Sequence, residues 1–441
     1  MKLNIQNVNK VKEASIQLNG LSVIVGENST GKSTVGRVLF STIKALANTM
    51  SNDGRNKNEQ MMKHVSSLYK RLFSKRTSQS MNEIEKFFPR LSFRFVNELE
   101  SSISIDSFID ERIGFIDRLE FSPRQKALMR QDLENIRKCK VSDNLATQLS
   151  SEIQYLIESE FLNKICSNNS QFGKVSFIGD DDGAELEYEI SESNLVKSVS
   201  CSTGGDFFQD ATYIESPLYL HMQDALRKTY IYRELEPERV LPEAMIPLHI
   251  KDVVSKMDAL RYLDKGLFSN SGDFHQIIKG EFIYDKKSRS IVFSENGTNY
   301  SPINVASGIK SFGILQILLD GGFISGNRIL IWDEPENHLH PQWQIEFAKI
   351  LVMLADSGIP ILISTHSPYF LQAIRFFSAG HAVEKYVNVY LAEEKEDGES
   401  VLEDVTKDLS KVFAKLAKPL NNIMNVDMQR MKTMKKYDTP S

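Results

Sequence analysis

The spacing of apolar positions changes along the chain, and each change predicts a type of element. Between residues 1 and 18 apolar and polar residues alternate over short runs, and residues 21–25 are mostly apolar. This pattern predicts two or three strands, with a tight turn at Asn19-Gly20. After a loop at residues 26–34, apolar residues recur at helical spacing; they are Val35, Val38, Leu39, Ile43 and Leu46.

A longer, charged and helical pattern follows. Residues 57–166 contain helical segments at 81–88, 123–139 and 144–165, without sustained heptads, so we expect an insertion that is not a long coiled coil. Strand patterns return in two hairpins, one around the acidic turn 180–183 and one with an Asn296-Gly297 turn. Between them we expect a strand at 211–214 and a second, mostly helical section at 222–268.

Helices alternate with buried strands from residue 302 to residue 389. We expect a helix at 312–319, strands at 328–332, 359–364 and 386–391, and an amphipathic helix at 341–357. The apolar face of that last helix carries Trp343, Phe347, Ile350, Leu351 and Leu354. Such alternation predicts a parallel sheet covered by helices, with ligands binding beyond the carboxyl ends of its strands.

Composition narrows the class only moderately. The chain has 441 residues, 41% of them hydrophobic and 25% charged, with a net charge of -5, which is ordinary for a soluble globular protein. Neither a membrane-spanning run nor a secretory signal is recognisable, so we expect a cytoplasmic protein without membrane partners. Its three cysteines match no zinc or disulfide framework; they are Cys139, Cys166 and Cys201.

The loop between the third strand and the first helix reads G-x-x-x-x-G-K-[ST]. Its glycines let the backbone curl so that N–H groups point at a phosphate, and the helix N-terminus adds partial positive charge. The lysine would reach the terminal phosphates, and the following serine hydroxyl would hold magnesium. The residues expected to bind the nucleotide are Gly26, Glu27, Asn28, Ser29, Thr30, Gly31, Lys32, Ser33 and Thr34.

Two carboxylates complete such a site. The apolar residues 329–332 are followed directly by Asp333 and Glu334, which a strand would carry to the edge of the sheet. Asp333 would hold the magnesium through water, and Glu334 can take a proton from the attacking water. Two acidic residues ending a strand are common by themselves, but here they accompany a complete phosphate loop.

Two further segments are weak when taken singly and gain meaning from their order. Ser307 and Gly308 open a predicted helix, where the hydroxyl and the backbone N–H groups form a second anion site. His366 ends the next predicted strand, at the same sheet edge as Glu334, where an imidazole can hydrogen-bond a terminal phosphate.

With these motifs in this order the chain resembles the ABC-type ATPases, in particular the branch of the RecF, SMC and OLD-nuclease ATPase heads. GENSTGKST matches Walker A, VASGIK the signature loop, RILIWDEPENHLHP Walker B with its D-loop, and STHS the switch histidine. The resemblance implies an α/β fold: an ABC-type P-loop ATPase head with a mostly parallel central sheet, an antiparallel β-subdomain and a helical insertion. It also implies ATP and Mg²⁺ as cofactors.

The resemblance also assigns roles to matched positions. Glu334 looks like the catalytic base, His366 like the sensor of the γ-phosphate, and Lys32 like the lysine that reaches the terminal phosphates. Ser33 and Asp333 look like the magnesium ligands.

Other matched positions would act across a dimer that encloses two ATP molecules. Ser307 and Gly308 of one subunit would cover the γ-phosphate held by the other, and residues 337–340 would form the D-loop. The signature departs from many relatives, because its second small residue and its acidic position are missing or displaced. We therefore expect slow, regulated turnover, and no residue is assigned to a Q-loop or to adenine stacking.

The expected domains follow from these boundaries. Only 50 residues follow residue 391, which is too few for the nuclease module of OLD-type relatives, so no intrinsic nuclease is expected. The divisions are 1–56 for the N-terminal part of the head, 57–166 for the helical insertion, 167–300 for hairpins and the second helical section, 301–400 for the C-terminal part of the head, and 401–441 for a helical, basic tail.

Three functions remain open. By resemblance to the ATPase subunits of bacterial antiphage systems of the Septu, retron and PARIS type, the chain would dimerise around ATP and control a separately encoded nuclease or toxin. The alternative is a RecF- or SMC-like DNA-binding repair clamp, whose contacts would come from the basic cluster Lys70, Arg71, Lys75 and Arg76. A nucleotide-locked scaffold with negligible hydrolysis is the third.

Overall fold

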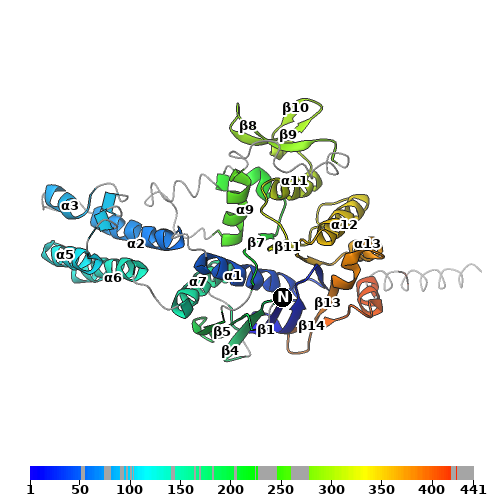
Figure 1. Ribbon diagram of the computed structural model, residues 1–441, viewed down its shortest axis with the longest axis horizontal. Coiled ribbons are helices and arrows are strands. Elements are labelled where there is room, and N and C mark those ends of the chain that lie inside the picture. Colours follow the sequence, from blue (N-terminus) through cyan, green and yellow to red (C-terminus); the bar gives the residue numbers. More distant parts are fainter. Residues whose placement is uncertain are drawn as a thin grey trace, which may run out of the picture. The chain divides into compact units, whose positions relative to one another are not determined.

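The fold consists of two compact units, and each is built from segments that are separate in the sequence. The computed structural model describes residues 1–50, 55–73, 81–89, 94–95, 98–99, 102, 104–140, 145–162, 165–167, 170–180, 183–202, 206–223, 225–226, 246–259, 278–418 and 424 (Figure 1). Unit 1 comprises Met1–Ala47, Leu149–Leu226 and Met245–Ser441, and unit 2 comprises Asn48–Gln148 and Arg227–Ala244. The proposed insertion at 57–166 thus overlaps unit 2 up to residue 148, whereas its last part is grouped with unit 1.

Unit 1 is an α/β structure built on one mixed sheet. The described strands form an 11-stranded sheet in the order β6-β5-β4-β1-β2-β14-β13-β3-β12-β11-β7. The strand bounds are β1 (Lys2–Val8), β2 (Val11–Gln17), β3 (Leu21–Gly26), β4 (Phe172–Ile178), β5 (Glu185–Ser191), β6 (Val196–Cys201), β7 (Asp210–Ile214), β11 (Arg328–Asp333), β12 (Ile361–Thr365), β13 (Val387–Glu394) and β14 (Ser400–Asp404).

The sheet changes character along its width. From β13 through β3, β12 and β11 to β7 every neighbouring pair is parallel, as the alternation of helices and buried strands predicted. From β6 to β2 every pair is antiparallel. The expected antiparallel β-subdomain is therefore continuous with the parallel part through the β2–β14 pair.

The chain bends at Asn19-Gly20 as expected, with Gly20 at φ +79°, and enters β3, which lies between β13 and β12 in the sheet. One local expectation was wrong. Residues 401–404 were expected to be helical, but they belong to β14, which pairs with β13 across a turn containing Gly398 at φ +78°. Pairing with β13 and with the distant β2 overrides the local pattern there.

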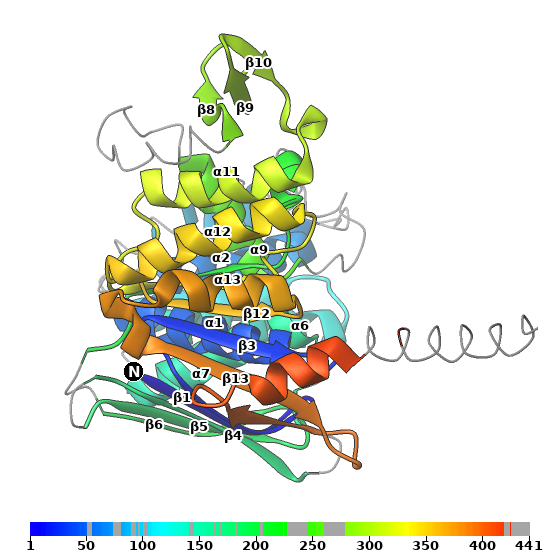
Figure 2. The ribbon, with the colours of Figure 1, turned by 90° about the vertical axis from the view of Figure 1, so that its right-hand side faces the viewer.

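Helices cover both faces of the parallel part. The helix α1 (Lys32–Met50) packs on one face, where Gly36 lies against Tyr213 and Ile331. On the other face lie α11 (Ser307–Asp320), α12 (Pro341–Asp356) and α13 (Pro368–Ser378), stacked side by side in Figure 2. Successive residues of β11 therefore point to opposite, equally buried faces, which explains its continuous apolar run.

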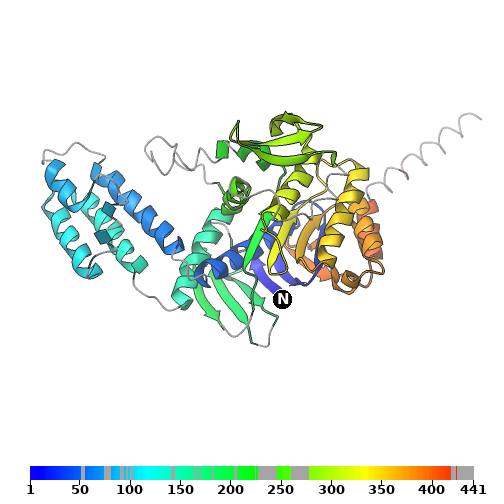
Figure 3. The same cartoon turned by 45° about the horizontal axis from the view of Figure 1, so that its top comes forward.

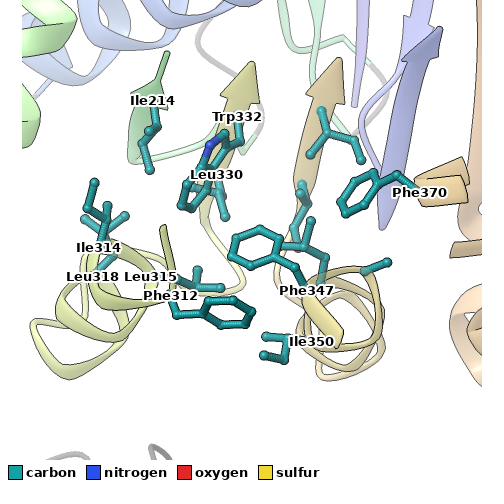
Figure 4. Packing of buried hydrophobic residues seen from close by; sticks show 14 of the residues in the cluster. Ile214, Phe312, Ile314, Leu315, Leu318, Leu330, Trp332, Phe347, Ile350 and Phe370 are labelled. Atoms are coloured by element: carbon teal, nitrogen blue, oxygen red, sulfur yellow. The ribbon is translucent and has the colours of Figure 1, made fainter. Parts of the chain in front are cut away.

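The larger core lies beneath α11 and α12. Phe312 and Phe347 meet edge to face, with ring centroids 5.0 Å apart, and Trp332 lies 5.2 Å from Phe347 (Figure 4). The predicted amphipathic face of α12 is confirmed, since Phe347, Ile350 and Leu351 are buried and Trp343 and Leu354 pack against the same core.

Three smaller elements complete unit 1. The helices α7 (Leu145–Phe161, in unit 1 from residue 149) and α9 (Leu248–Ala259) flank the sheet. A separate sheet contains β8 (Glu281–Asp285), β9 (Ser290–Glu295) and β10 (Thr298–Tyr300). Its β9–β10 turn is the predicted Asn296-Gly297, where both residues have positive φ.

Unit 2 is helical. Its described helices are α2 (Arg55–Phe73), α3 (Met81–Phe87), α5 (Ile105–Arg118) and α6 (Pro123–Lys140), with α6 packed against α2 and α5 (Figure 3). Tyr69, Phe88, Phe95 and Phe115 gather in its core. The helices predicted at 81–88 and 123–139 are thereby confirmed, while Lys75 and Arg76 lie outside the described residues. None of the described helices is long and apolar enough to span a membrane.

Candidate nucleotide-binding site

The phosphate loop connects β3 to α1 and needs both of its glycines. Gly31 has φ +81°, and a Cβ there would lie 2.8 Å from the Val11 side chain, while a Cβ on Gly26 would lie 2.8 Å from the Ala392 carbonyl oxygen. The Thr30 hydroxyl donates to the Glu27 carbonyl at 2.8 Å and closes the turn. The chain has no room here for larger residues, so the backbone itself forms the floor of the site.

Lys32 is held over this loop. Its side-chain Nζ donates to the carbonyl oxygens of Gly26 at 3.0 Å and Glu27 at 2.8 Å, and the residue is 6% exposed. Burial lowers the pKa of Lys32, although Glu334 and Asp333 act in the opposite direction. Since Lys32 is also the first residue of α1, it lies where the first N–H groups of a helix have no partners within the helix and can bind phosphate oxygens.

Asp333 is the last residue of β11 and meets a set of hydroxyl groups. It accepts hydrogen bonds from the Ser364 hydroxyl and, at 3.3 Å, from the Tyr213 hydroxyl. Burial raises the pKa of Asp333, and hydrogen bonds involving Ser33 and Ser364 oppose that rise. A carboxylate beside the Ser33 hydroxyl is an oxygen donor set of the kind that Mg²⁺ prefers, so the predicted magnesium ligands fit that ion.

Glu334 is fixed by both its backbone and its side chain. It has φ +48°, in the left-handed region, and its N–H donates to the Ser364 carbonyl at 3.0 Å. One carboxylate oxygen, Oε2, accepts a hydrogen bond from the Asn337 amide at 2.8 Å. The other, Oε1, lies 3.9 Å from Lys32 Nζ and 3.3 Å from His366 Nδ1. Backbone strain of this type is concentrated at functional sites.

His366 follows β12 directly and faces two carboxylates. Its Nδ1 lies 3.3 Å from Glu334 Oε1 and 3.6 Å from Glu336 Oε1, and its side chain is 45% exposed. The structure thus brings together Lys32, Ser33, Asp333, Glu334 and His366 at the carboxyl edge of β3, β12 and β11, as the sequence predicted.

The predicted signature residues are not part of this cluster. Ser307 begins α11, and Gly308 packs where a Cβ would lie 3.0 Å from the Trp343 ring and 3.1 Å from Leu339. The hydrogen bonds and ion pairs of the described residues do not join Ser307 or Gly308 to residues 26–34. The N-cap position, Ala306, makes no side-chain capping bond.

A buried charged network lies behind Asp333. The Tyr213 hydroxyl also donates to Glu215 at 3.3 Å, and His249, fully buried, stands between Glu160 (2.6 Å) and Glu215 (3.3 Å). Burial opposes its charging, but hydrogen bonds to the two carboxylates outweigh this and raise the pKa of His249 to about 9. Burial would likewise raise the pKa of Glu215, but His249 and Arg37 lower it to about 2.

Sequence reasoning missed most of this second layer. Glu215 could have been found, because it follows the predicted strand 211–214 just as Asp333 follows β11. Glu336 and His249 gave no such signal, since neither their spacing nor their neighbours indicate a tertiary partner. His340, assigned to the D-loop by resemblance, accepts a hydrogen bond from the Gln342 N–H and caps α12. In the described part of the chain, no group of three or more His, Cys, Asp or Glu residues is placed to hold a metal ion.

Comparison with known families places the chain. Residues 1–371 match the family model described as AAA ATPase domain, and the protein belongs to that family. No curated protein matches the sequence.

Solved SMC head structures are similar at low identity. One, an SMC head bound to the C-terminal winged-helix domain of ScpA, has 11% identity and a TM-score of 0.42, covering 93% of this chain and 98% of its own. The SMC head domain from Thermotoga maritima has 10% identity and a TM-score of 0.35, with 92% and 98% covered. A Pyrococcus furiosus complex of the SMC head with the ScpA C-terminal domain has 10% identity and a TM-score of 0.41, with 96% and 98% covered.

Proposed function

We propose that the protein binds ATP with Mg²⁺ and hydrolyses the γ-phosphate bond in a site completed by a second copy of the chain. The observation that carries this proposal is the meeting of Lys32, Asp333, Glu334 and His366 at one edge of the sheet, beside the phosphate loop. In this arrangement a cation, a metal-binding carboxylate, a base and an imidazole lie close together. Phosphoryl transfer needs this set for positioning and for charge stabilisation.

Each residue has a defined task in this mechanism. Glu334 takes the proton of the attacking water, and Asn337 keeps its carboxylate oriented through the 2.8 Å hydrogen bond. Lys32 leaves the loop carbonyls to neutralise charge on the terminal phosphates, and His366 bonds the γ-phosphate. Ser33 and Asp333 would hold Mg²⁺, which would supply neutralisation of phosphate charge when bound.

The second copy supplies what this edge lacks. Ser307 and Gly308 offer a hydroxyl and the uncapped N–H groups at the start of α11, a good anion site. Since they make no contact with the phosphate loop of their own chain, we propose that they cover the γ-phosphate held by the partner. Two identical sites then form across a twofold axis.

Molar mass in solution tests this proposal. We expect the wild-type chain and Glu334→Gln to become dimers when ATP and Mg²⁺ are added, with the Gln variant trapped because it cannot hydrolyse. Ser307→Arg should stay monomeric, although it still binds ATP. A molar mass that does not respond to ATP in all three proteins would overturn the composite site.

We further propose that the ATP cycle controls a separately encoded effector, a nuclease or toxin, in antiphage defence. This proposal rests on the resemblance of the Walker A, signature, Walker B and switch motifs to those of ATPase subunits that act with a separately encoded effector. Reconstitution with the product of a neighbouring gene tests this, since the effector's activity should differ between wild type and Glu334→Gln. Equal activity with both would contradict it.

A DNA clamp is the second candidate. Lys70 is exposed in the last turn of α2, which favours a phosphate contact, but Arg71 is paired with Asp132 at 3.0 Å. Neutralising Lys70, Arg71, Lys75 and Arg76 should remove salt-sensitive DNA binding if the clamp is correct. DNA binding unchanged by these substitutions would exclude this surface.

A further inference from the structure

Glu336 is a buried carboxylate that the mechanism above does not use. It lies two residues after Glu334, on the turn between β11 and α12, and is 3% exposed. Its Oε2 has no hydrogen-bond partner among the described residues, although it is buried. A buried carboxyl group with one unpartnered oxygen costs folding free energy, which points to a local role for Glu336.

The Glu336 carboxylate accepts hydrogen bonds from the segment that carries the switch histidine. Its Oε1 accepts from the Thr365 hydroxyl at 2.6 Å and from the His366 backbone N–H at 3.0 Å. The same oxygen lies 3.6 Å from His366 Nδ1. Thr365 in turn accepts from the Ser367 N–H at 3.0 Å. One carboxylate oxygen therefore fixes the backbone at residues 365–366 and places the His366 ring next to a carboxylate.

We propose that Glu336 is a positioning residue for His366: it anchors residues 365–366, so that Nδ1 of the ring faces the carboxylates of Glu334 and Glu336. Both atoms that face Nδ1 are carboxylate oxygens and can only accept, so the ring carries its hydrogen there. Nε2 is then the ring nitrogen available to the γ-phosphate. The inference rests on the proposed ATPase function, because a fixed His366 ring changes the rate only if the site hydrolyses ATP.

The bonds that Glu336 accepts are strongest when its carboxyl group is ionised. Hydrogen bonds from neutral donors to a carboxylate are about twice as strong as those between neutral groups. Burial raises the pKa of Glu336, and the bonds from Thr365 and His366 oppose that rise. A glutamine in this place keeps an acceptor for both donors and loses the charge, whereas an alanine loses both.

Two substitutions therefore test the proposal: one removes both the acceptor and the charge, and the other removes only the charge. Glu336→Ala should lower kcat about 10- to 100-fold, the loss seen when the supporting partner of an active-site group is removed, with KM for ATP within about twofold. Glu336→Gln should recover most of this loss.

Asp356→Asn is the matched control. Asp356 also accepts a backbone N–H, from Val383 at 2.9 Å, and lies 3.3 Å from a histidine Nδ1, that of His381. It ends α12, at the opposite end from the site, so its kcat should equal that of wild type.

A second readout separates positioning from general damage and needs no activity. In protein with ¹⁵N-labelled histidine, the His366 ring signals, identified by their loss in His366→Gln, should show one tautomer in wild type and in Asp356→Asn. They should shift in Glu336→Gln, even if the Ala variant fails to fold.

Unchanged ring signals, or kcat within twofold of wild type in Glu336→Ala, would overturn the role of Glu336. Failure of the ATPase proposal itself would look different, since wild type and Asp356→Asn would then show no more phosphate release than Lys32→Ala.

Discussion

The side-chain amide of Asn337 donates a hydrogen bond to Glu334 Oε2 at 2.8 Å. Asn337 lies in the segment expected to cross the dimer, while Glu334 is the proposed base. The contact joins these two functions within one turn, whose backbone is closed by the Asn337 N–H donating to the Glu334 carbonyl at 3.0 Å. Movement of this segment on dimerisation would therefore move the Glu334 carboxylate directly.

Removal of that amide should slow hydrolysis and spare binding. In Asn337→Ala the Glu334 carboxylate loses its fixed orientation, and we expect kcat to fall about tenfold or more, because general-base catalysis depends on geometry. Asn337→Asp should be worse, since it puts a second carboxylate beside the first. Steady-state phosphate release and ATP titration measure the two effects. A reduced ATP affinity with normal kcat would contradict the assignment.

Gly31→Ala should damage the phosphate loop beyond the cost of its backbone angle. Gly31 and Gly380 have φ of +81° and +80°, but only at Gly31 would a Cβ meet an atom within 3 Å, Val11 Cγ2 at 2.8 Å. Alanine in this region of φ costs about 1–2 kcal/mol. We expect that loss in the free energy of unfolding of Gly380→Ala, and a larger loss together with weakened ATP binding in Gly31→Ala. Equal losses would show that the Val11 contact is unimportant.

The buried pair of His249 and Glu215 predicts a defined pH window of stability. His249 has a folded pKa of about 9 against an ordinary 6.5, so its stabilisation is complete below about pH 6.5 and is lost as pH rises through 9. Glu215, lowered to about 2, contributes above its ordinary 4.5 and loses this as pH falls toward 2.

Chemical denaturation across pH checks this window. The two shifts share the His249–Glu215 contact, while Glu160 adds to one and Arg37 to the other, so they are not to be added. His249→Gln should flatten the alkaline limb of the stability profile. An unchanged alkaline limb in that variant would contradict the charged state of His249.

Lys256 should be indispensable for stability. Its Nζ donates to the Thr212 hydroxyl at 2.6 Å and pairs with Asp210 at 2.8 Å and Asp252 at 2.7 Å, with 7% of the side chain exposed. In Lys256→Met these partly buried carboxylates keep only part of their compensation, and we expect a loss of about 3–5 kcal/mol. Lys411→Met, which removes an exposed pair with Glu403, should change little. Comparable losses in both would refute the distinction.

The candidate site could be predicted from the sequence because its residues lie in short contiguous segments. Asp333, Glu334 and His366 stand at strand ends that local apolar runs define, and Lys32 begins the helix after the phosphate loop. The sheet order was not predictable in this way, because β14 and β13 enter between β2 and β3 from the far end of the chain.

The supporting residues are also tertiary products. Glu336 accepts hydrogen bonds from residues that follow it by about 30 positions in the chain, and His249 meets Glu160 from another helix. Neither contact leaves a periodic trace. In the sequence, Glu336 and Glu160 look like ordinary turn and helix residues, and only the three-dimensional structure shows their partners.

Subunit complementation tests the central claim most directly. Glu334→Gln lacks the base and Ser307→Arg lacks the covering face, so each should be inactive alone. Mixed in equal amounts before ATP is added, they should recover turnover, because each mixed dimer holds one intact composite site, with Glu334 from one copy and Ser307 from the other. Activity no greater than the sum of the two separate variants would contradict a site shared between two copies of the chain.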